Sequence, residues 1–266
     1  MNHPSSTPPA VAVITCAVLD AEIRHLASSL PCVRHIETLE QGLHNEPPRL
    51  RREVQAAIER IENTCAVDAI ALGYGLCSRG TEGLTAGRCA LVMARAHDCI
   101  TLLLGCRRRY ASYLAEHPGT YWYSHGWNRH HLPPGQQRYE KLYQQYLERF
   151  GEDDAKYLME VEQAWFRSYS RATYVDLGVG TTGEDLQYTQ QCARWLGWAY
   201  DYQRGDAGLL RTLLSGPWDR ERFVVLRPGE TFQMTADDRV IEATVKGRRA
   251  ARPADATPPE PAGAAP

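Results

Sequence analysis

Short β-rich runs alternate with longer helical patterns along almost the whole chain, and this alternation restricts the fold more than any other feature of the sequence. Residues 49–63 show the helical pattern clearly, because their apolar side chains recur at steps of three and four. Chains in which strands and helices alternate form parallel sheets covered by helices. Strands are predicted at 11–15, 33–39, 67–72, 90–94, 120–124, 172–177, 198–202 and 222–226, and helices at 19–30, 49–63, 100–116, 136–150, 153–168, 184–196 and 207–214.

The predicted fold class is therefore α/β. The strands fit one large sheet or two small lobes, and we favour two Rossmann-like lobes of parallel sheet flanked by helices, with a ligand cleft between them. Residues 11–118 are expected to form an N-terminal α/β lobe and residues 119–246 a C-terminal α/β lobe. The ends at 1–10 and 247–266 are rich in Pro and small residues, which predicts disordered tails.

Charge and hydropathy exclude several classes of protein. The chain has 30 Lys+Arg against 32 Asp+Glu, which argues against nucleic-acid binding through a generally basic surface. No apolar run approaches the roughly 20 residues of a membrane helix, and the N-terminus lacks the pattern of a signal peptide. A cytoplasmic location is expected, and in a reducing cytosol the 8 cysteines are expected to be thiols, metal ligands or redox groups rather than disulfides.

Cysteine and histidine residues follow the predicted strands of the first lobe at the points where those strands end. Cys16 follows the first strand, Cys77 lies shortly after the third, and His97 and Cys99 follow the fourth. Since parallel strands bring their carboxyl ends to one edge of a sheet, these side chains are expected to converge. Thiolate and imidazole are ligands of zinc, and thiolates also hold iron–sulfur clusters. We predict a metal site here, with His44 as a weaker further ligand.

The same residues also have ordinary structural interpretations. A free cysteine often only fills a core, no CxxC spacing is present, and a histidine such as His44 is commonly a polar loop residue. Asp98 suits the N-cap of the following helix, and Arg95 suits either a surface ion pair or an anion site near the thiols. Cys106 follows Cys99 by two helical turns, so one helix could carry both on one face. Structural roles are predicted for Cys32, Cys65, Cys89 and Cys192.

Several blocks of this sequence resemble an uncharacterised family, domain of unknown function 1638. They are GYGLCS at 73–78, RAHDCITLLLG at 95–105, HPGTYW at 117–122 and GW at 126–127, and the resemblance runs from Val11 to about Gly229. Members of that family often lie near genes for corrinoid-dependent methyl-transfer proteins. The resemblance therefore implies a link to one-carbon or metal-cofactor metabolism, with a corrinoid or methyl-transfer protein as partner. It brings no established activity.

The His97-x-Cys99 pair with a distant cysteine is also similar to the zinc site of thiol-directed methyltransferases. In such enzymes zinc lowers the pKa of a substrate thiol so that the thiolate attacks a methyl group. That likeness makes a metal-dependent methyltransferase one hypothesis for this chain, with Cys77 or Cys16 completing the ligand set. The fold expected here differs from the barrel of those enzymes.

The second lobe carries a competing signal at a strand–loop–helix junction. Gly178, Gly180 and Gly183 have G-x-G-x-x-G spacing, and Asp201 follows at a distance close to that of a ribose-binding acid. This pattern favours a nucleotide or S-adenosylmethionine, although a flexible Gly-Thr loop explains it equally simply. Three hypotheses remain open: a protein with a Cys/His metal site, a nucleotide or S-adenosylmethionine binder, and a non-catalytic partner or chaperone of a metalloprotein. The first is preferred.

Overall fold

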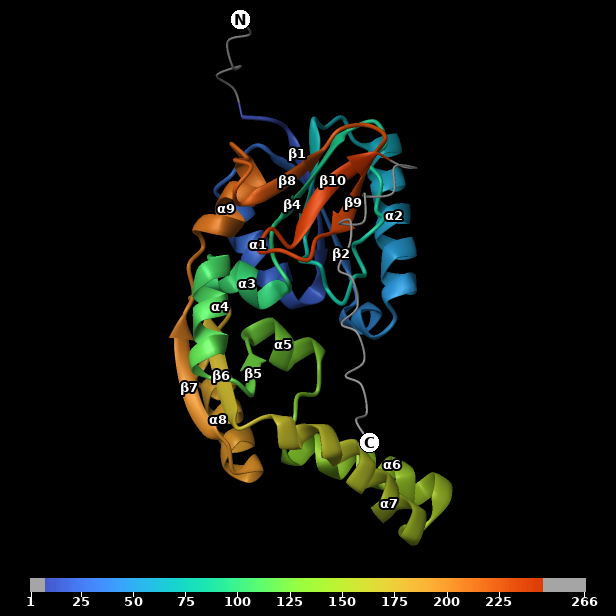
Figure 1. The fold of residues 1–266 in the computed structure, drawn as a ribbon, viewed down its shortest axis with the longest axis vertical. Helices are drawn as coiled ribbons and strands as arrows, with labels where there is room; N and C mark the ends of the chain where they lie inside the picture. Colours follow the sequence, from blue (N-terminus) through green and yellow to red (C-terminus); the bar gives the residue numbers. More distant parts are fainter. Residues whose placement is uncertain (1–7, 246–266) are drawn as a thin grey trace, which may run out of the picture.

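The computed structural model describes residues 8–245 and has the predicted α/β class (Figure 1). One sheet of five strands and one of three carry most of the helices, and a two-stranded hairpin packs against the first. The tail predicted at 247–266, and residues 1–7 of the other predicted tail, lie outside the described residues. Within residues 8–245, no helix combines the length and apolar character needed to cross a membrane.

The first sheet has the strand order β2-β1-β3-β4-β8. Its first four strands are parallel, and β8 is antiparallel to β4. The inner part of such a sheet is buried on both faces, so β1, β3 and β4 read as nearly continuous apolar runs, whereas β2 at the edge is only partly buried. Their bounds are β1 (Val11–Cys16), β2 (Val33–Leu39), β3 (Ala69–Gly73), β4 (Ala90–Ala94) and β8 (Phe223–Leu226).

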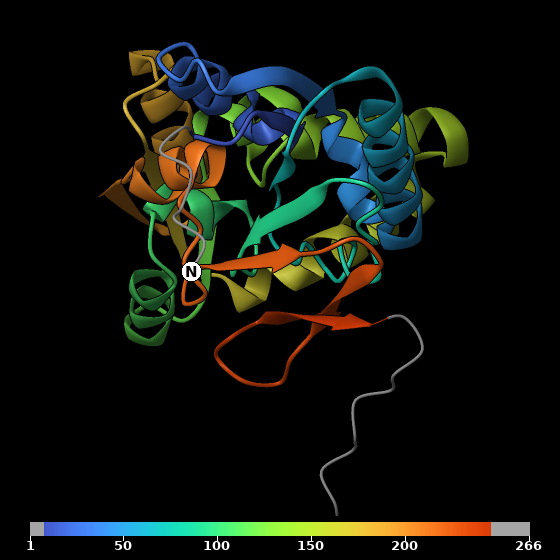
Figure 2. The ribbon, with the colours of Figure 1, turned by 90° about the horizontal axis from the view of Figure 1, so that it is seen from above.

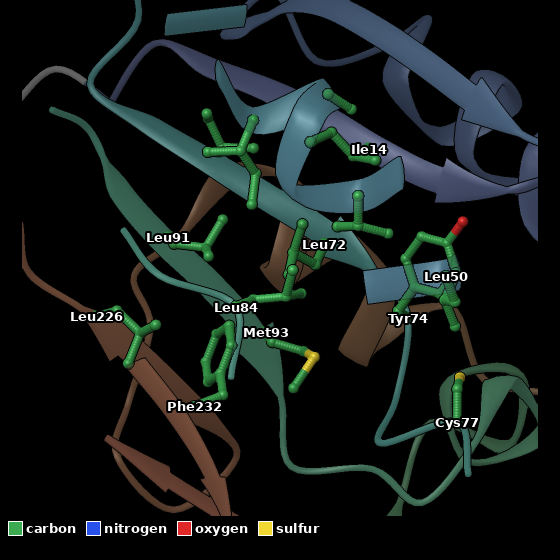
Figure 3. Close-up of a cluster of buried hydrophobic side chains, with 14 of the residues drawn as sticks. Ile14, Leu50, Leu72, Tyr74, Cys77, Leu84, Leu91, Met93, Leu226 and Phe232 are labelled. Atoms are coloured by element: carbon green, nitrogen blue, oxygen red, sulfur yellow. The ribbon is translucent and has the colours of Figure 1, made fainter. Parts of the chain in front are cut away.

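Helices cover both faces of this sheet because successive strand residues point to opposite sides. On one face, Ala12 and Ile14 pack with the apolar stripe of α2 (Pro47–Thr64) (Figure 3). On the other face, Val11 and Val13 pack with three further helices. These are α1 (Asp20–Ala27), α3 (Cys99–Leu104) and α9 (Gly208–Ser215).

The second sheet has the order β5-β6-β7 and is parallel throughout. Tyr123, Tyr174 and Cys192 form its small core with α8. The hairpin of α6 and α7 projects away from both sheets in Figure 1. The bounds are β5 (Thr120–Tyr123), β6 (Arg171–Asp176), β7 (Ala199–Arg204), α4 (Arg107–Glu116), α5 (His125–His130), α6 (Gln136–Phe150), α7 (Glu152–Ala164) and α8 (Gly183–Leu196), with 3₁₀ turns η1 (Ala17–Leu19), η2 (Gln41–Asn45) and η3 (Trp165–Ser168).

The end of the chain returns to the first sheet, although the sequence pattern places it in the second lobe. β8 pairs with β4, and Val224 and Phe223 join the clusters on opposite faces of the first sheet. The hairpin of β9 (Glu230–Met234) and β10 (Ile241–Val245) follows, and its Phe232 is buried in the first cluster. Figure 2 shows this hairpin beside the first sheet. The apolar pattern of β8 gives no indication of which sheet will bury it.

The single helix predicted at 100–116 is two helices, α3 and α4. Gly105 separates them with a left-handed backbone (φ 74°), and a Cβ there would come within 2.5 Å of the Asp206 carbonyl oxygen. Only glycine fits this junction without strain. The prediction that one helix could carry Cys99 and Cys106 on one face is therefore wrong, because Cys99 begins α3 and Cys106 is the extended N-cap residue before α4.

The two lobes meet at a close backbone contact between α5 and η1. A Cβ built on Gly126 would lie 1.8 Å from the carbonyl oxygen of Val18, a distance that no side chain can occupy. Both partners are backbone, so neither can rotate away. Gly126 therefore sets how closely α5 approaches the first sheet.

Gly126→Ala should lower the free energy of unfolding by about 3 kcal/mol, because the lobes must separate locally to admit the methyl group. Gly183→Ala is the matched control: it is helical, has nothing within 4 Å of its Cβ position, and should stabilise by about 0.5 kcal/mol. Urea unfolding of both variants measures this. Equal stability of Gly126→Ala and the native protein would contradict the contact.

Glu22 is a buried carboxyl group on α1, only 2% exposed, and its Oε2 has no hydrogen-bond partner among the described residues. Burial, with smaller contributions from the charges of Asp20 and Asp176, raises the pKa of Glu22 to about 7. The folded protein therefore holds a proton that the unfolded chain releases above about pH 4.3. The contribution of the neutral Glu22 carboxyl to the free energy of unfolding is fully present below that pH. It is lost as pH rises through about 7.

Glu22→Gln should remove this loss. The free energy of unfolding of the variant minus that of the native protein should therefore increase by about 2 kcal/mol between about pH 5 and about pH 8. Unfolding by urea at several pH values provides the measurement. Glu59→Gln, a change of the same chemistry at an exposed position of α2, should show no such increase. A native protein and a Glu22→Gln variant with the same pH dependence would contradict the assignment.

Candidate functional site

The carboxyl ends of β1, β3 and β4 meet at one edge of the first sheet, as the sequence predicts. The register pairs Thr15 with Gly73, so the residues that follow, Cys16 and Tyr74, lie at neighbouring strand ends. The segments after β3 and β4 are joined by a hydrogen bond of 2.9 Å from the Cys77 amide to the His97 carbonyl. The chain therefore gathers residues that are far apart in sequence.

Gly75 makes the approach of these two segments possible. A Cβ at this position would lie 2.7 Å from the amide nitrogen of Asp98 and 2.8 Å from the carbonyl oxygen of Ala96. Distances this short to backbone atoms exclude a side chain. Gly75 thus allows the backbone packing that brings Cys77 toward the β4 end.

The structure brings the thiols of Cys16, Cys77 and Cys99 into one neighbourhood. Cys16 and Cys77 are buried, and Cys99 is partly buried. Burial raises the pKa of Cys16 to about 11, and it also raises the pKa of Cys77 and of Cys99 well above the ordinary value of a thiol. After burial, the pKa of Cys99 is raised by the charges of Asp98, Cys77 and Cys16, since like charges in an apolar site oppose ionisation. All three are therefore neutral thiols at neutral pH.

His44 on η2 completes this cluster. Its Nδ1 lies 4.0 Å from the Cys16 sulfur and 3.3 Å from the Gln41 carbonyl oxygen. Burial is the largest cause of a lowered pKa at His44, so the ring is neutral. A carbonyl oxygen can only accept, so Nδ1 carries the proton and Nε2 keeps a free lone pair. We name Cys16, His44, Cys77 and Cys99 the thiol cluster.

Tyr74 also belongs to the site, although no sequence pattern singles it out. Its ring stacks near His44 with centroids 6.3 Å apart, and its buried hydroxyl has no hydrogen-bond partner among residues 8–245. Burial, followed by the charges of Cys16 and Cys77, raises its pKa well above the ordinary value. Figure 3 shows Tyr74 and Cys77 at one end of the core cluster. An orphaned buried hydroxyl beside thiols is an unused donor.

The backbone is strained where it carries Cys77. Cys77, Ser78 and Arg79 have φ values of 46°, 54° and 67°, which is three consecutive left-handed residues that are not glycine. Each such residue costs about 1–2 kcal/mol. The Thr81 hydroxyl supports the turn by donating to the Gly75 carbonyl oxygen at 3.0 Å. Strain of this kind persists where the surrounding structure enforces it, often at functional sites.

His97 and Asp98 take different positions from the thiols. The His97 side chain is exposed, and its ring stacks with Tyr110 at 6.4 Å. Asp98 is the predicted N-cap of α3: its carboxylate accepts from the amides of Ile100 and Thr101 at 3.1 and 3.2 Å. The structure therefore favours His44 over His97 as the imidazole of the thiol cluster.

The arrangement of the thiol cluster is not that of a preformed metal centre. Within the part of the chain that the structure describes, no group of three or more His, Cys, Asp or Glu side chains is placed to hold an ion. The donor types are those that zinc prefers, but their atoms are not gathered at coordinating distances. The metal site stays a prediction.

The Gly-rich loop of the second lobe is bonded to its own side chains. Asp176 at the end of β6 accepts from the Gly178 amide and from the Thr181 hydroxyl, both at 2.7 Å. At the start of α8, Thr182 and Asp185 form a capping box. Gly180 is left-handed, and a Cβ there would lie 2.7 Å from the His125 ring. The amides of Gly178, Thr182 and Asp185 are thus already used, which favours a structural loop.

Asp201 lies within β7, opposite Thr173 of β6, rather than at the carboxyl end of the strand. Its carboxylate accepts from the Tyr113 hydroxyl and, at 3.2 Å, from Gln203. Gly183 is the first residue of α8. These positions do not gather the glycines and Asp201 as a ribose-binding arrangement requires, and nucleotide or S-adenosylmethionine binding stays a prediction.

The fold and the site together define a two-lobed α/β protein with a buried thiol and imidazole cluster at the carboxyl edge of its first sheet. Residues 38–214, more than half of the chain, match the family described as protein of unknown function (DUF1638), and the chain belongs to that family. His44, Tyr74, Cys77 and Cys99 lie within the match, and Cys16 precedes it. No curated protein and no solved structure matches the chain.

Tyr74→Phe should stabilise the metal-free protein by about 1 kcal/mol, because it removes a buried hydroxyl that lacks a partner. Tyr123→Phe is the matched control: its hydroxyl is also buried but donates to the Pro134 carbonyl oxygen at 2.8 Å, so its loss should destabilise by a similar amount. Urea unfolding of both variants gives the comparison. Destabilisation by both changes would show that Tyr74 has a partner.

Proposed function

We propose that the thiol cluster binds a thiophilic metal ion, with zinc as the first candidate and an iron–sulfur cluster as the alternative. The observation that carries the proposal is the convergence of three thiols and one imidazole from four separate segments of the chain. Sulfur and imidazole nitrogen are the ligands that zinc prefers, and thiolates hold iron–sulfur clusters. With Nδ1 held by Gln41, His44 would ligate through Nε2, as is typical of a ligating histidine, and the Cys16 sulfur, now 4.0 Å from Nδ1, would have to move toward Nε2.

The cluster residues would have to respond to such an ion in two ways. The three thiols must each lose a proton, which burial opposes until a nearby positive charge compensates. The side chains must also move closer together, because the described arrangement does not gather three ligands. Tyr74 can then donate its unused hydroxyl to a thiolate, so that the new charge is hydrogen-bonded.

We further propose a role in methyl transfer, which the family resemblance supports. A bound zinc ion would supply Lewis acidity that lowers the pKa of a coordinated thiol. We propose that the chain acts in the cytoplasm with a corrinoid or methyl-transfer protein, as an enzyme or as a non-catalytic partner. All eight cysteines are free, which fits a reducing compartment. Co-purification with a methyl-transfer protein tests the partnership.

Protein purified without oxygen should hold about one zinc ion per chain, and Cys77→Ser and Cys99→Ser should each weaken zinc binding more than tenfold. Elemental analysis measures the content, and titration against a chelating dye measures the affinity. Cys106→Ser, at an exposed position outside the cluster, is the control and should bind normally. Retention of full metal content by both cluster variants would overturn the proposal, and an air-sensitive brown colour would identify an iron–sulfur cluster.

A second test of the same site asks which histidine binds zinc and whether zinc binding releases protons. His44→Ala should weaken zinc binding, whereas His97→Ala should leave it unchanged. Because three neutral thiols must ionise, zinc affinity should rise from about pH 6 to about pH 8, with protons released on binding. Titration calorimetry in two buffers of different ionisation enthalpy counts those protons. Binding without proton release would contradict the thiol assignment.

A further inference from the structure

A cavity of about 200 Å³ lies between the junction of α3 with α4 and the segment that enters β8. None of the thiol-cluster residues lines it. Leu209 and Gly105 form part of its wall, and charged side chains and one thiol form the rest. We name it the arginine pocket, after its lining residues Arg95, Cys106, Arg107, Arg108, Glu221 and Arg222.

The positive charge of this pocket exceeds its negative charge. Four arginines line it against one carboxylate, Glu221. Glu221 pairs with Arg108 at 3.3 Å, and Arg222 pairs with Asp219 at 2.7 Å. All four of these side chains are largely exposed, so solvent weakens both pairs. The other two arginines are left with little compensation.

Arg95 and Arg107 are partly buried cations that line the pocket, and the charge of Arg107 acts on Arg95. Arg95 donates to the carbonyl oxygens of Arg220 at 3.0 Å, Arg239 at 3.2 Å and Ile241, so carbonyl dipoles rather than a carboxylate hold it. Arg107 has a side chain only 19% exposed, and its closest carboxylate, Asp238, lies 3.8 Å away and is 88% exposed. That separation is too long for a hydrogen bond. Burial, followed by the charges of Arg107 and Arg239, lowers the pKa of Arg95, and the smaller contributions of Glu242 and Asp237 do not offset this.

The first turn of α4 borders the same pocket, because Arg107 and Arg108 line it, and no side chain of the described residues caps this helix end. Cys106 is the N-cap, and its side chain accepts no capping hydrogen bond. The first turn of this ten-residue helix has no acidic side chain and begins with Arg107 and Arg108. Helix amides and guanidinium groups that face one cavity favour an oxyanion with several acceptor atoms.

We infer that the arginine pocket binds a small phosphoryl group, either as free phosphate or as the phosphate of a small metabolite. A phosphoryl group offers enough oxygens for two guanidinium groups and the helix amides at once, whereas a single carboxylate offers only two. Its charge would balance Arg95 and Arg107. This binding site is independent of the thiol cluster and of any metal.

Titration calorimetry with inorganic phosphate and with methyl phosphate, at constant ionic strength, tests the inference. The native protein should bind at least one of them, and the tighter of the two identifies the source of the phosphoryl group. Arg107→Gln should weaken binding about tenfold or more. Arg108→Glu, a charge reversal at an exposed position that the fold tolerates, should weaken it as well. Arg149→Gln on the projecting α6 is the control and should bind as the native protein does.

The Cys106 thiol provides a second readout within the pocket. Cys106 is exposed and lines the cavity, so bound phosphate should slow its alkylation by iodoacetamide, followed residue by residue by mass spectrometry. Alkylation of the partly buried Cys65, outside the pocket, should not change. The inference is overturned if neither anion binds, if Arg107→Gln and Arg108→Glu bind as tightly as Arg149→Gln, or if phosphate slows both cysteines equally.

Discussion

The parallel pairing of β1, β3 and β4 is the constraint on which the candidate site depends. Each strand buries residues on both faces. In β1, Ala12 and Ile14 lie on one side and Val11 and Val13 on the other. A shift of one residue would exchange these faces, so the register is firmly specified. The register in turn decides which residues emerge together at the carboxyl edge. The thiol cluster is therefore positioned by the most buried part of the molecule.

The site concentrates features that oppose stability. A buried hydroxyl lacks a partner, three successive residues are left-handed, and three thiols lie where their ionised forms would repel. A core has no need of such features, since apolar residues would pack there at lower cost. Local departures of this kind are typical of binding sites, where the strain and unused donors are met by a ligand. The proposed metal ion would compensate the thiolate charges, and a thiolate would accept the hydrogen bond of the Tyr74 hydroxyl.

The return of the chain to its first sheet connects the two halves of the molecule. β8 adds to the edge of β4, and the segments around it supply Arg222 and the carbonyl groups that hold Arg95. Arg95 is expected from the sequence to lie near the thiols or in a surface ion pair. It instead donates to these carbonyls and borders the arginine pocket. One sheet edge thus carries a thiol cluster, and a neighbouring junction carries a cationic pocket.

The sequence by itself determined the α/β class, most helices and strands, the Asp98 cap and the carboxyl-edge position of Cys16, Cys77 and Cys99. Periodic burial and capping are local properties, so they can be read from neighbouring residues. Tertiary structure alone decided that His44 rather than His97 lies beside a thiol, that the Tyr74 hydroxyl has no partner within residues 8–245, and that β8 crosses back. These depend on side-chain direction and on contacts between distant segments, and no local pattern encodes either one.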